Sequence, residues 1–277
     1  MIQKAHNFIP VLSSDAGACL TGSNWREAES HSAVYYLDSL LLKPGFDLLK
    51  KIPDLAAYLG WSGTLILNAS NLKANKEGIF TLISPYDGSK IRLSFSELLD
   101  LVLHLKPDMV LLPEQVMQNC PDIWDKWNDD IMPFLAAEDL AQQELHREHG
   151  IYYILGDASL NSSTIEQIAK SKDKPCYISG KISFDLIKLS ASLGIEFIES
   201  DEPATLAMQG QVYSRNGVIH LIDPQTEMDF SLIDSECLCP TCTRQLTKAY
   251  LHHLFLHTPL LCQRFLIQHN VFLVNAG

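Results

Sequence analysis

Short apolar runs rich in β-branched and aromatic residues alternate along the chain with longer segments whose apolar residues recur every three or four positions. The first pattern predicts buried strands and the second predicts amphipathic helices. Eight strands are predicted, at Phe8–Leu12, Ala33–Leu37, Thr64–Leu67, Asp108–Leu112, Met132–Leu135, Ile151–Leu155, Cys176–Ile178 and Glu196–Ile198. Helical segments between them include PDLAAYLG, SFSELLDLVLHLK, AEDLAQQELHREHG, SSTIEQIAKSK and SFDLIKLSASLG, and several begin with Ser or Asp and end with Gly.

This alternation of strand and helix predicts an α/β protein with a parallel sheet. Eight strand–helix units favour a closed (β/α)8 barrel of the TIM type, and an open doubly wound sheet is the competing architecture. Two additions interrupt the pattern. A hairpin is expected near residues 79–93, after the third strand, because Asp87-Gly88 is a turn signal. Further short β segments are expected between residues 211 and 235.

Composition and charge narrow the class of protein. The chain has 277 residues, of which 47% are hydrophobic, so it is long and apolar enough to bury a large core. No apolar stretch reaches the roughly 18 residues of a membrane-spanning helix, and the start MIQKAHNFIP does not have the order of a signal peptide. A cytoplasmic protein is therefore expected. The net charge of -12 argues against broad, non-specific binding of nucleic acid.

Three of the seven cysteines lie within six residues, in CLCPTC, at Cys237, Cys239 and Cys242. Pro240 supplies a bend that would let their sulfurs surround one ion, and zinc is the natural ion for such a set. A structural zinc site needs a fourth ligand. The candidates are the downstream histidines, His252, His253, His257 and His269.

On a helix the segment YLHHLFLH places His253 and His257 on one face, where they could bind a metal. Partial exposure on the helix surface is the simpler interpretation for each of His252, His253 and His257. The cysteines outside the cluster are interpreted as small hydrophobic residues, namely Cys19, Cys120, Cys176 and Cys262.

We predict two domains: a barrel body over residues 1–236, and a zinc-binding subdomain with the barrel-closing helix over residues 237–277. The second segment contains no acidic residue, and Arg244, Lys248 and Arg264 give it a charge of +3. That charge could offer a local surface to an RNA backbone, or it could be a solvated helix face. The sequence leaves both interpretations open.

Barrel enzymes carry their active sites at the carboxyl ends of the strands. The residues one or two positions past the predicted strands include Asp38, Asn68, Glu114, Gly156 with Asp157, and Glu199 with Asp201. Glu114 and Glu199 could converge on one ligand as acid, base or nucleophile. The alternative for each is a solvated loop charge.

The segment DSECLCPTCTRQLTKAYLHHLFLHTPLLCQRFLIQHN resembles the zinc segment of the tRNA-guanine transglycosylases, or queuine tRNA-ribosyltransferases, which exchange guanine in tRNA for a 7-deazaguanine. The resemblance continues through KPDMVLLPE and KPCYISGKISFDLIKLSASLGIEFIES and covers nearly the whole chain. It implies a (β/α)8 barrel with the zinc subdomain inserted near the last strand and helix. It also implies dimer assembly through that region, and His269 of the closing HN pair as the fourth zinc ligand.

The same resemblance implies substituted catalytic positions. Glu199 stands where the family has the aspartate nucleophile that bonds to ribose, and Asn68 stands where it has a second aspartate. Glu114 and Gly156 stand at substrate-binding positions, and the family has an aspartate where this chain has Glu114. A displacement of a reacting group by about 1 Å can cost on the order of 100-fold in rate, and the Asn68 amide cannot accept a proton.

The leading hypothesis is a tRNA-guanine transglycosylase-like protein of queuosine modification, weak or inactive in catalysis. It would act as a tRNA-binding or dimer-partner subunit, in a homodimer or in a heterodimer with a catalytic transglycosylase. Two alternatives remain open. One is an active base-exchange enzyme with Glu199 as its nucleophile, and the other is a purine- or deazapurine-binding protein without tRNA activity.

Overall fold

The structure, a computed structural model, describes residues 7–140 and 147–276. Eight strands form one parallel sheet in the order β1-β10-β9-β8-β7-β6-β3-β2. Their bounds are β1 Asn7–Ile9, β2 Ser32–Tyr36, β3 Thr64–Asn68, β6 Met109–Leu111, β7 Met132–Ala136, β8 Gly150–Leu155, β9 Cys176–Gly180 and β10 Phe197–Glu199.

Each of the eight strands lies within one to three residues of the predicted position. The first strand, β1, pairs in parallel with the last, β10, through Asn7 and Phe197, Phe8 and Ile198, and Ile9 and Glu199. A first strand beside the last one is the order of a barrel and not of an open doubly wound sheet. The fold is a (β/α)8 barrel, and this prediction is confirmed.

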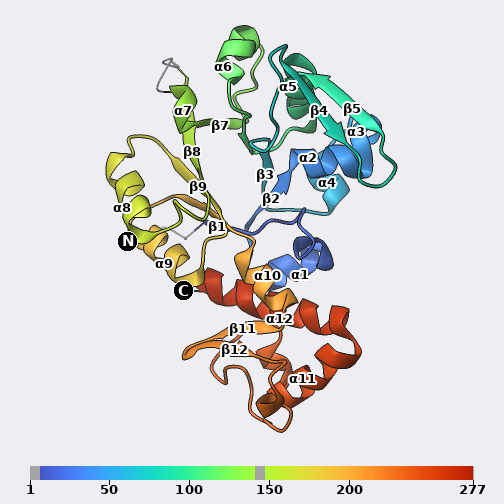
Figure 1. Cartoon of the computed structure of the whole chain (residues 1–277), viewed down its shortest axis with the longest axis vertical. Coiled ribbons are helices and arrows are strands. Elements are labelled where there is room, and N and C mark those ends of the chain that lie inside the picture. The colour runs from blue at the N-terminus through green and yellow to red at the C-terminus, as the bar shows by residue number, and fades with distance from the viewer. Residues whose placement is uncertain (1–6, 141–146, 277) are drawn as a thin grey trace. The chain divides into compact units, whose positions relative to one another are not determined.

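Helices follow or connect most of these strands (Figure 1). Their bounds are α1 Gly22–Glu27, α2 Leu37–Leu40, α3 Phe46–Leu49, α4 Leu55–Leu59, α5 Phe95–Leu105, α6 Val116–Asn119, α7 Ala137–Leu140, α8 Ser162–Ser171, α9 Phe184–Ser192, α10 Glu202–Met208, α11 Lys248–His257 and α12 Pro259–Ala276. Short helical turns lie at Gly17–Cys19, Leu41–Gly45, Pro121–Asp125, Pro224–Thr226 and Cys242–Arg244. The predicted helix AEDLAQQELHREHG extends beyond α7 into residues 141–146, outside the described residues.

Local signals explain where these helices begin. The Asp54 carboxylate accepts a hydrogen bond from the backbone N–H of Ala57, which caps α4. At α5, Ser94 and Glu97 satisfy each other's backbone N–H groups, which is the reciprocal arrangement of a capping box. Among the residues that the structure describes, no helix is long and apolar enough to cross a membrane.

Two small antiparallel sheets interrupt the alternation. The predicted hairpin is confirmed as β4 (Ile79–Ile83) and β5 (Lys90–Ser94), which pair from Ile79 with Ser94 to Ile83 with Lys90. The later β segments are β11 (Gln211–Ser214) and β12 (Gly217–His220), which pair in the same way. Both hairpins are drawn as pairs of adjacent arrows in Figure 1.

By its internal contacts the chain divides into two units. Unit 1 contains residues 1–31, 155–170 and 180–277, and unit 2 contains residues 32–154 and 171–179. In unit 1, α12 contacts α10, α11 and β11, so this long helix organises the part of the chain that carries the cysteine cluster (Figure 1). The predicted boundary at residue 237 stays a prediction.

The core of unit 2 is built from strand residues that are buried on both faces of the sheet. Leu65, Ile66 and Leu67 of β3 are at most 1% exposed, which explains why this strand is a continuous apolar run. The ring of Phe134 on β7 meets the edge of the Tyr177 ring on β9, with centroids 5.5 Å apart. The absence of a side chain at Gly150 leaves room for the Phe134 ring.

The substitution Gly150→Ala should lower the free energy of unfolding by about 1–3 kcal/mol, because the added methyl group would overlap the buried ring of Phe134. Chemical denaturation measures this change. Gly156→Ala is the matched control, since nothing lies within 4 Å of a methyl group at that position. Equal stability of the two variants would contradict this account of the packing.

Candidate functional site

Three cysteines and one histidine form a compact buried cluster in unit 1. Their ligand atoms, the sulfurs of Cys237, Cys239 and Cys242 and a ring nitrogen of His269, all lie within 4.8 Å of one another. The Nδ1 atom of His269 lies 3.3 Å from the sulfur of Cys239, 3.4 Å from that of Cys242 and 3.9 Å from that of Cys237. Four donors at such mutual distances can surround a single ion.

A tight turn brings the three sulfurs together. The backbone N–H of Cys242 donates to the sulfur of Cys239 at 3.2 Å, and the Thr241 hydroxyl donates to the carbonyl of Phe265 at 2.6 Å. The first bond closes the turn across Pro240, and the second fastens it to α12 one helical turn before His269. The cysteine spacing in the sequence predicted the turn, and α12 supplies the fourth donor.

The backbone of Tyr213 orients the histidine. The Nε2 atom of His269 lies 2.8 Å from the Tyr213 carbonyl oxygen, which can only accept a hydrogen bond, so Nε2 carries a proton and Nδ1 is the ring nitrogen directed at the three sulfurs. The side chain of Asn270 accepts from the Tyr213 N–H and donates to the carbonyls of Pro203 and Gln211. The HN pair therefore joins the cluster to α10 and β11.

The electrostatics of the cluster fit a cation. Burial lowers the pKa of His269, but hydrogen bonds with Cys237 and Cys239 outweigh this effect and raise it to about 9. Hydrogen bonds from Cys239 and Cys242 hold the pKa of Cys237 far below its ordinary value, whereas hydrogen bonding to the other sulfurs and burial raise the pKa of Cys242. The Cys237 thiolate is thus stabilised by hydrogen bonds from the neighbouring thiols. A bound metal ion would stabilise it in their place.

The other histidines separate into two kinds. His252 is buried, and its Nδ1 lies 2.7 Å from the Leu221 carbonyl oxygen and 3.1 Å from the Thr226 hydroxyl. The prediction that His252 is partly exposed on the helix surface is wrong, because the loop that carries Leu221 and Thr226 covers it. His253 and His257 are exposed, as predicted.

In unit 2, polar residues follow the ends of β2, β3 and β6. The carboxamide oxygen of Asn68, at the end of β3, is buried and accepts hydrogen bonds from the N–H and the hydroxyl of Ser70, at 3.0 and 2.6 Å. Burial raises the pKa of Asp38, and hydrogen bonds from the Ser39 N–H and the Asn71 side chain partly oppose that shift. The loop after β3 therefore contacts α2, which directly follows β2.

The same loop also reaches Glu114, which follows β6. The Lys73 ammonium lies 3.7 Å from the Glu114 carboxylate, and both side chains are largely exposed, so the pair contributes little to stability. Unit 2 thus brings Asp38, Asn68 and Glu114 to one set of loops at the carboxyl ends of neighbouring strands.

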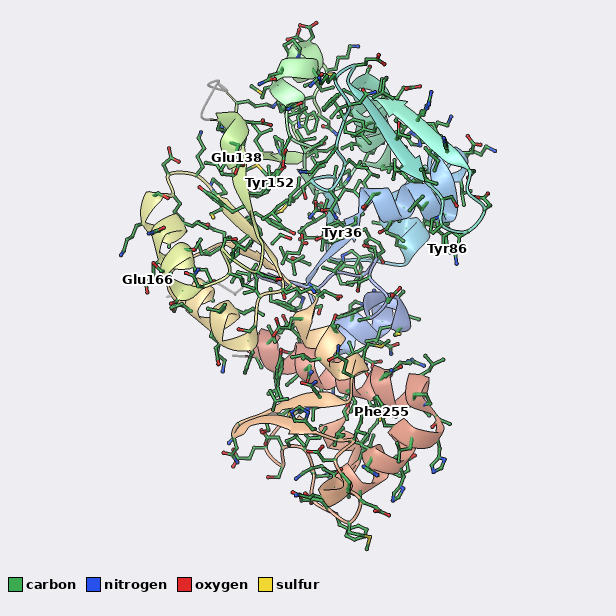
Figure 2. All side chains as sticks on the ribbon, viewed as in Figure 1. Tyr36, Tyr86, Glu138, Tyr152, Glu166 and Phe255 are labelled. Carbon is green, nitrogen blue, oxygen red and sulfur yellow. The ribbon has the colours of Figure 1, made fainter. Side chains whose placement is uncertain are left out.

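Two further residues that contact the segment after β6, on α7 and β8, were not among the predicted site residues. The buried Asp139 carboxylate accepts bonds from the Gln115 N–H at 2.8 and 3.0 Å, and the Tyr152 hydroxyl donates to the Leu112 carbonyl at 2.8 Å. Burial, followed by the charges of Glu114, Asp139 and Glu138, raises the pKa of Tyr152. Figure 2 shows Tyr152 and Glu138 close together, on β8 and α7. The acidic AED segment directly after β7 was the available signal.

In unit 1, Glu199 is the last residue of β10, and its side chain is 1% exposed. Burial raises the pKa of the neighbouring Asp201; hydrogen bonds from the Ser14 and Thr205 hydroxyls oppose the shift, and the charge of Glu199 adds to it. Those bonds measure 2.8 and 2.9 Å. Ser14 was not predicted as a site residue, because nothing in the sequence shows that it lies beside Asp201.

Gly156 and Asp157 begin the loop after β8 in unit 1. The carbonyl oxygen of Gly156 accepts hydrogen bonds from the N–H groups of Ser159 and Leu160, both at 2.9 Å. Gly156 and Asp157 are exposed, so this loop forms a tight, accessible turn. An approaching ligand would meet backbone at this position, since Gly156 has no side chain.

Comparison with known proteins agrees with this architecture. Residues 157–276 match the model of the family described as Queuine tRNA-ribosyltransferase. Proteins of that name in Clostridium kluyveri, Thermotoga maritima and Dehalococcoides mccartyi are 22%, 24% and 25% identical to the chain. These alignments cover 88%, 95% and 97% of the chain, and 77%, 82% and 79% of the respective relatives.

The chain is similar to the queuine tRNA-ribosyltransferase family over residues 157–276, and to relatives of that name over most of its length. The matched segment includes Glu199 and the whole Cys3His cluster. The arrangement of Cys237, Cys239, Cys242 and His269 could hold a metal ion.

Cys239→Ser should lower the free energy of unfolding by about 3 kcal/mol or more, because structural metal sites contribute strongly to folding. Thermal and chemical denaturation measure this loss. Cys120→Ser, at a half-buried thiol outside the cluster, should stay within about 1 kcal/mol of the unmodified chain. A chelator should then destabilise the unmodified chain and the control but not Cys239→Ser. An unchanged melting temperature for Cys239→Ser would contradict a structural metal centre.

Proposed function

We propose that the Cys3His cluster binds zinc as a structural ion. Three thiolates and one imidazole are a standard ligand set for tetrahedral zinc, and thiolate sulfur selects against magnesium and calcium. All four side chains are at most 9% exposed, which leaves no open position for a substrate, as in a structural site. The ion would fix the turn around Pro240 to α12.

Metal analysis of the purified chain should find one zinc ion per chain. Treatment with 1,10-phenanthroline, which chelates zinc, should lower the melting temperature, and the non-chelating isomer 1,7-phenanthroline should not. A chain that retains its stability while the metal content is zero would refute the zinc assignment.

We also propose that the chain acts in queuosine modification of tRNA as a transglycosylase-like protein with weak or absent base exchange. In the resemblance to the family, a carboxylate attacks C1′ of the ribose, the bond to guanine breaks, and the enzyme remains linked to the sugar until the new base displaces it. In this chain Glu199 stands at the position of the attacking group, and Glu114 and Gly156 stand at the positions toward the base.

The neutral amide at Asn68 carries this proposal. Its oxygen is fully engaged as an acceptor from both donors of Ser70, so the side chain is held rigidly. An amide cannot take or release a proton near pH 7, whereas the carboxylate of the family can. Glu199 and Glu114 retain charge but carry one more methylene than aspartate. The extra methylene moves the carboxylate outward, and a displacement of about 1 Å can lower the rate on the order of 100-fold.

A non-catalytic role would require contact with tRNA or with a partner chain. Lys248 is not available as a free cation, because its ammonium lies 2.7 Å from the Asp229 carboxylate and is mostly buried. Arg244 and Arg264 are exposed and could meet phosphates. Exposed apolar side chains on α11 and α12, at Leu256, Leu260 and Leu261, support assembly through this region, with a second copy or with a catalytic transglycosylase.

Incubation with tRNA and labelled guanine should give incorporation at least about 100-fold slower than that of a transglycosylase with intact aspartates, since the proton-accepting carboxylate is lacking. Glu199→Gln should change this low rate little, with Glu227→Gln, an exposed carboxylate, as the control. Efficient incorporation that Glu199→Gln abolishes would instead establish an active enzyme. Calorimetric binding of guanine or queuine without salt-dependent binding of tRNA would favour the purine-binding alternative.

A further inference from the structure

A cavity of about 620 Å³ lies in unit 1, between α9, α10, β11 and α12, and Cys237 of the metal cluster forms part of its wall. Its volume falls within the range typical of small-molecule sites. One part of its wall is apolar and is contributed by Leu206, Phe272 and Leu273. The remaining wall carries charged and aromatic side chains, and these set the chemistry that the cavity can accept.

Tyr213 is the most firmly held residue that we describe in this wall. It is 4% exposed, and its ring stacks on that of Phe184 with centroids 4.8 Å apart and planes 14° from parallel. Its backbone is bonded on both sides to α12, through His269 and Asn270. Within the described part of the chain, however, the Tyr213 hydroxyl has no hydrogen-bond partner. A buried polar group without a partner costs about 1–3 kcal/mol, so its retention favours a ligand at that position.

Two carboxylates lie near the hydroxyl. Glu202 at the start of α10 and Asp185 in the first turn of α9 both line the cavity that Tyr213 lines. Burial, followed by the charges of Glu202 and Asp185, raises the pKa of Tyr213.

 Among the residues that the structure describes, neither carboxylate forms an ion pair. The cavity therefore presents the Tyr213 hydroxyl, which has no hydrogen-bond partner in the described structure, beside two carboxylates, of which Glu202 is also influenced by the charge of Lys181.

The charges elsewhere on the wall do not cancel these carboxylates. The Arg215 guanidinium is already paired with Asp234, at 3.2 Å, and with Glu236. The Lys188 ammonium lies 3.9 Å from the centroid of the Phe184 ring, on which it stacks. Four carboxylates and two cations line the cavity, so its excess charge is negative and favours a cationic ligand.

We propose that this cavity binds an aliphatic primary amine, whose ammonium group is held by the carboxylates of Glu202 and Asp185 and by the hydroxyl oxygen of Tyr213. An ammonium group has three N–H donors and no acceptor, which matches three oxygen acceptors. The methylene chain of the amine packs against Leu206, Phe272 and Leu273. This site is independent of the proposed role in tRNA modification.

The test is calorimetric titration of the full, metal-loaded chain with 1,5-diaminopentane and with its neutral analogue 1,5-pentanediol. The diamine should bind at least about 10-fold more tightly than the diol, because a charge-assisted hydrogen bond contributes about 1.5–3 kcal/mol and 1.4 kcal/mol is tenfold in affinity. Equal affinity for the two compounds, or no binding of the diamine, would overturn the proposal.

Two variants locate the site. Glu202→Gln should weaken binding of the diamine about 10-fold, and Tyr213→Phe should weaken it about 3-fold or more. Glu227→Gln, which removes an exposed carboxylate outside the cavity, is the control and should leave the affinity unchanged. Unchanged affinity for the diamine in both Glu202→Gln and Tyr213→Phe would show that the amine does not bind in this cavity.

Tyr213→Phe also provides a check that does not depend on a measured affinity. Because the hydroxyl has no partner in the described structure, its removal should leave the melting temperature of the ligand-free chain unchanged or raise it. The diamine should then stabilise the unmodified chain more than this variant. A large loss of stability in ligand-free Tyr213→Phe would show that the hydroxyl is already used within the protein.

The ammonium group could belong to a free amine or to a lysine side chain of another protein, and a third titration distinguishes them. Nα-acetyl-lysine-N-methylamide presents the same ammonium group on a peptide-like backbone. Tighter binding of this compound than of the diamine assigns the site to a lysine side chain, and the reverse assigns it to a free amine. Displacement of both by magnesium at equal concentration would mean that the cavity is a metal site and would refute the proposal.

Discussion

The convergence of three sulfurs and one imidazole is the constraint on which the order of unit 1 depends. These donors come from a turn and from α12, and the HN pair that contains the imidazole extends the network to α10 and β11. Hydrogen bonds in such a buried place are strong when every partner is present and costly when one is missing. The cluster, the turn and the hairpin of β11 and β12 are therefore parts of one cooperative assembly.

The barrel could be predicted from the sequence because its strands are buried on both faces. Continuous apolar runs such as the one in β3 mark parallel strands, and all eight are confirmed within three residues. The Asp87-Gly88 signal likewise located the hairpin of β4 and β5. These features are determined by residues that are close together in the sequence, so a local pattern is enough to predict them.

The candidate site was only partly predictable, because its remaining features depend on segments that are distant in sequence. Spacing identified the three cysteines, but only the family resemblance selected His269 among four histidines. His252 was misplaced because a loop some 30 residues earlier covers it. Asp201 was expected at a strand end, whereas its partner Ser14 lies 187 residues away in the sequence. Asp139 and Tyr152 were missed for the same reason.

The hydrogen bonds at the end of β3 bear on which side chains residue 68 could carry. Ser70 presents both of its donors to a single oxygen of Asn68, and a carboxylate would offer that oxygen equally well. The two hydrogen bonds from Ser70 would therefore form with an acid at this position as they do with the amide. At residue 68, an amide that cannot exchange a proton differs from an acid that can only by the replacement of one nitrogen atom with oxygen.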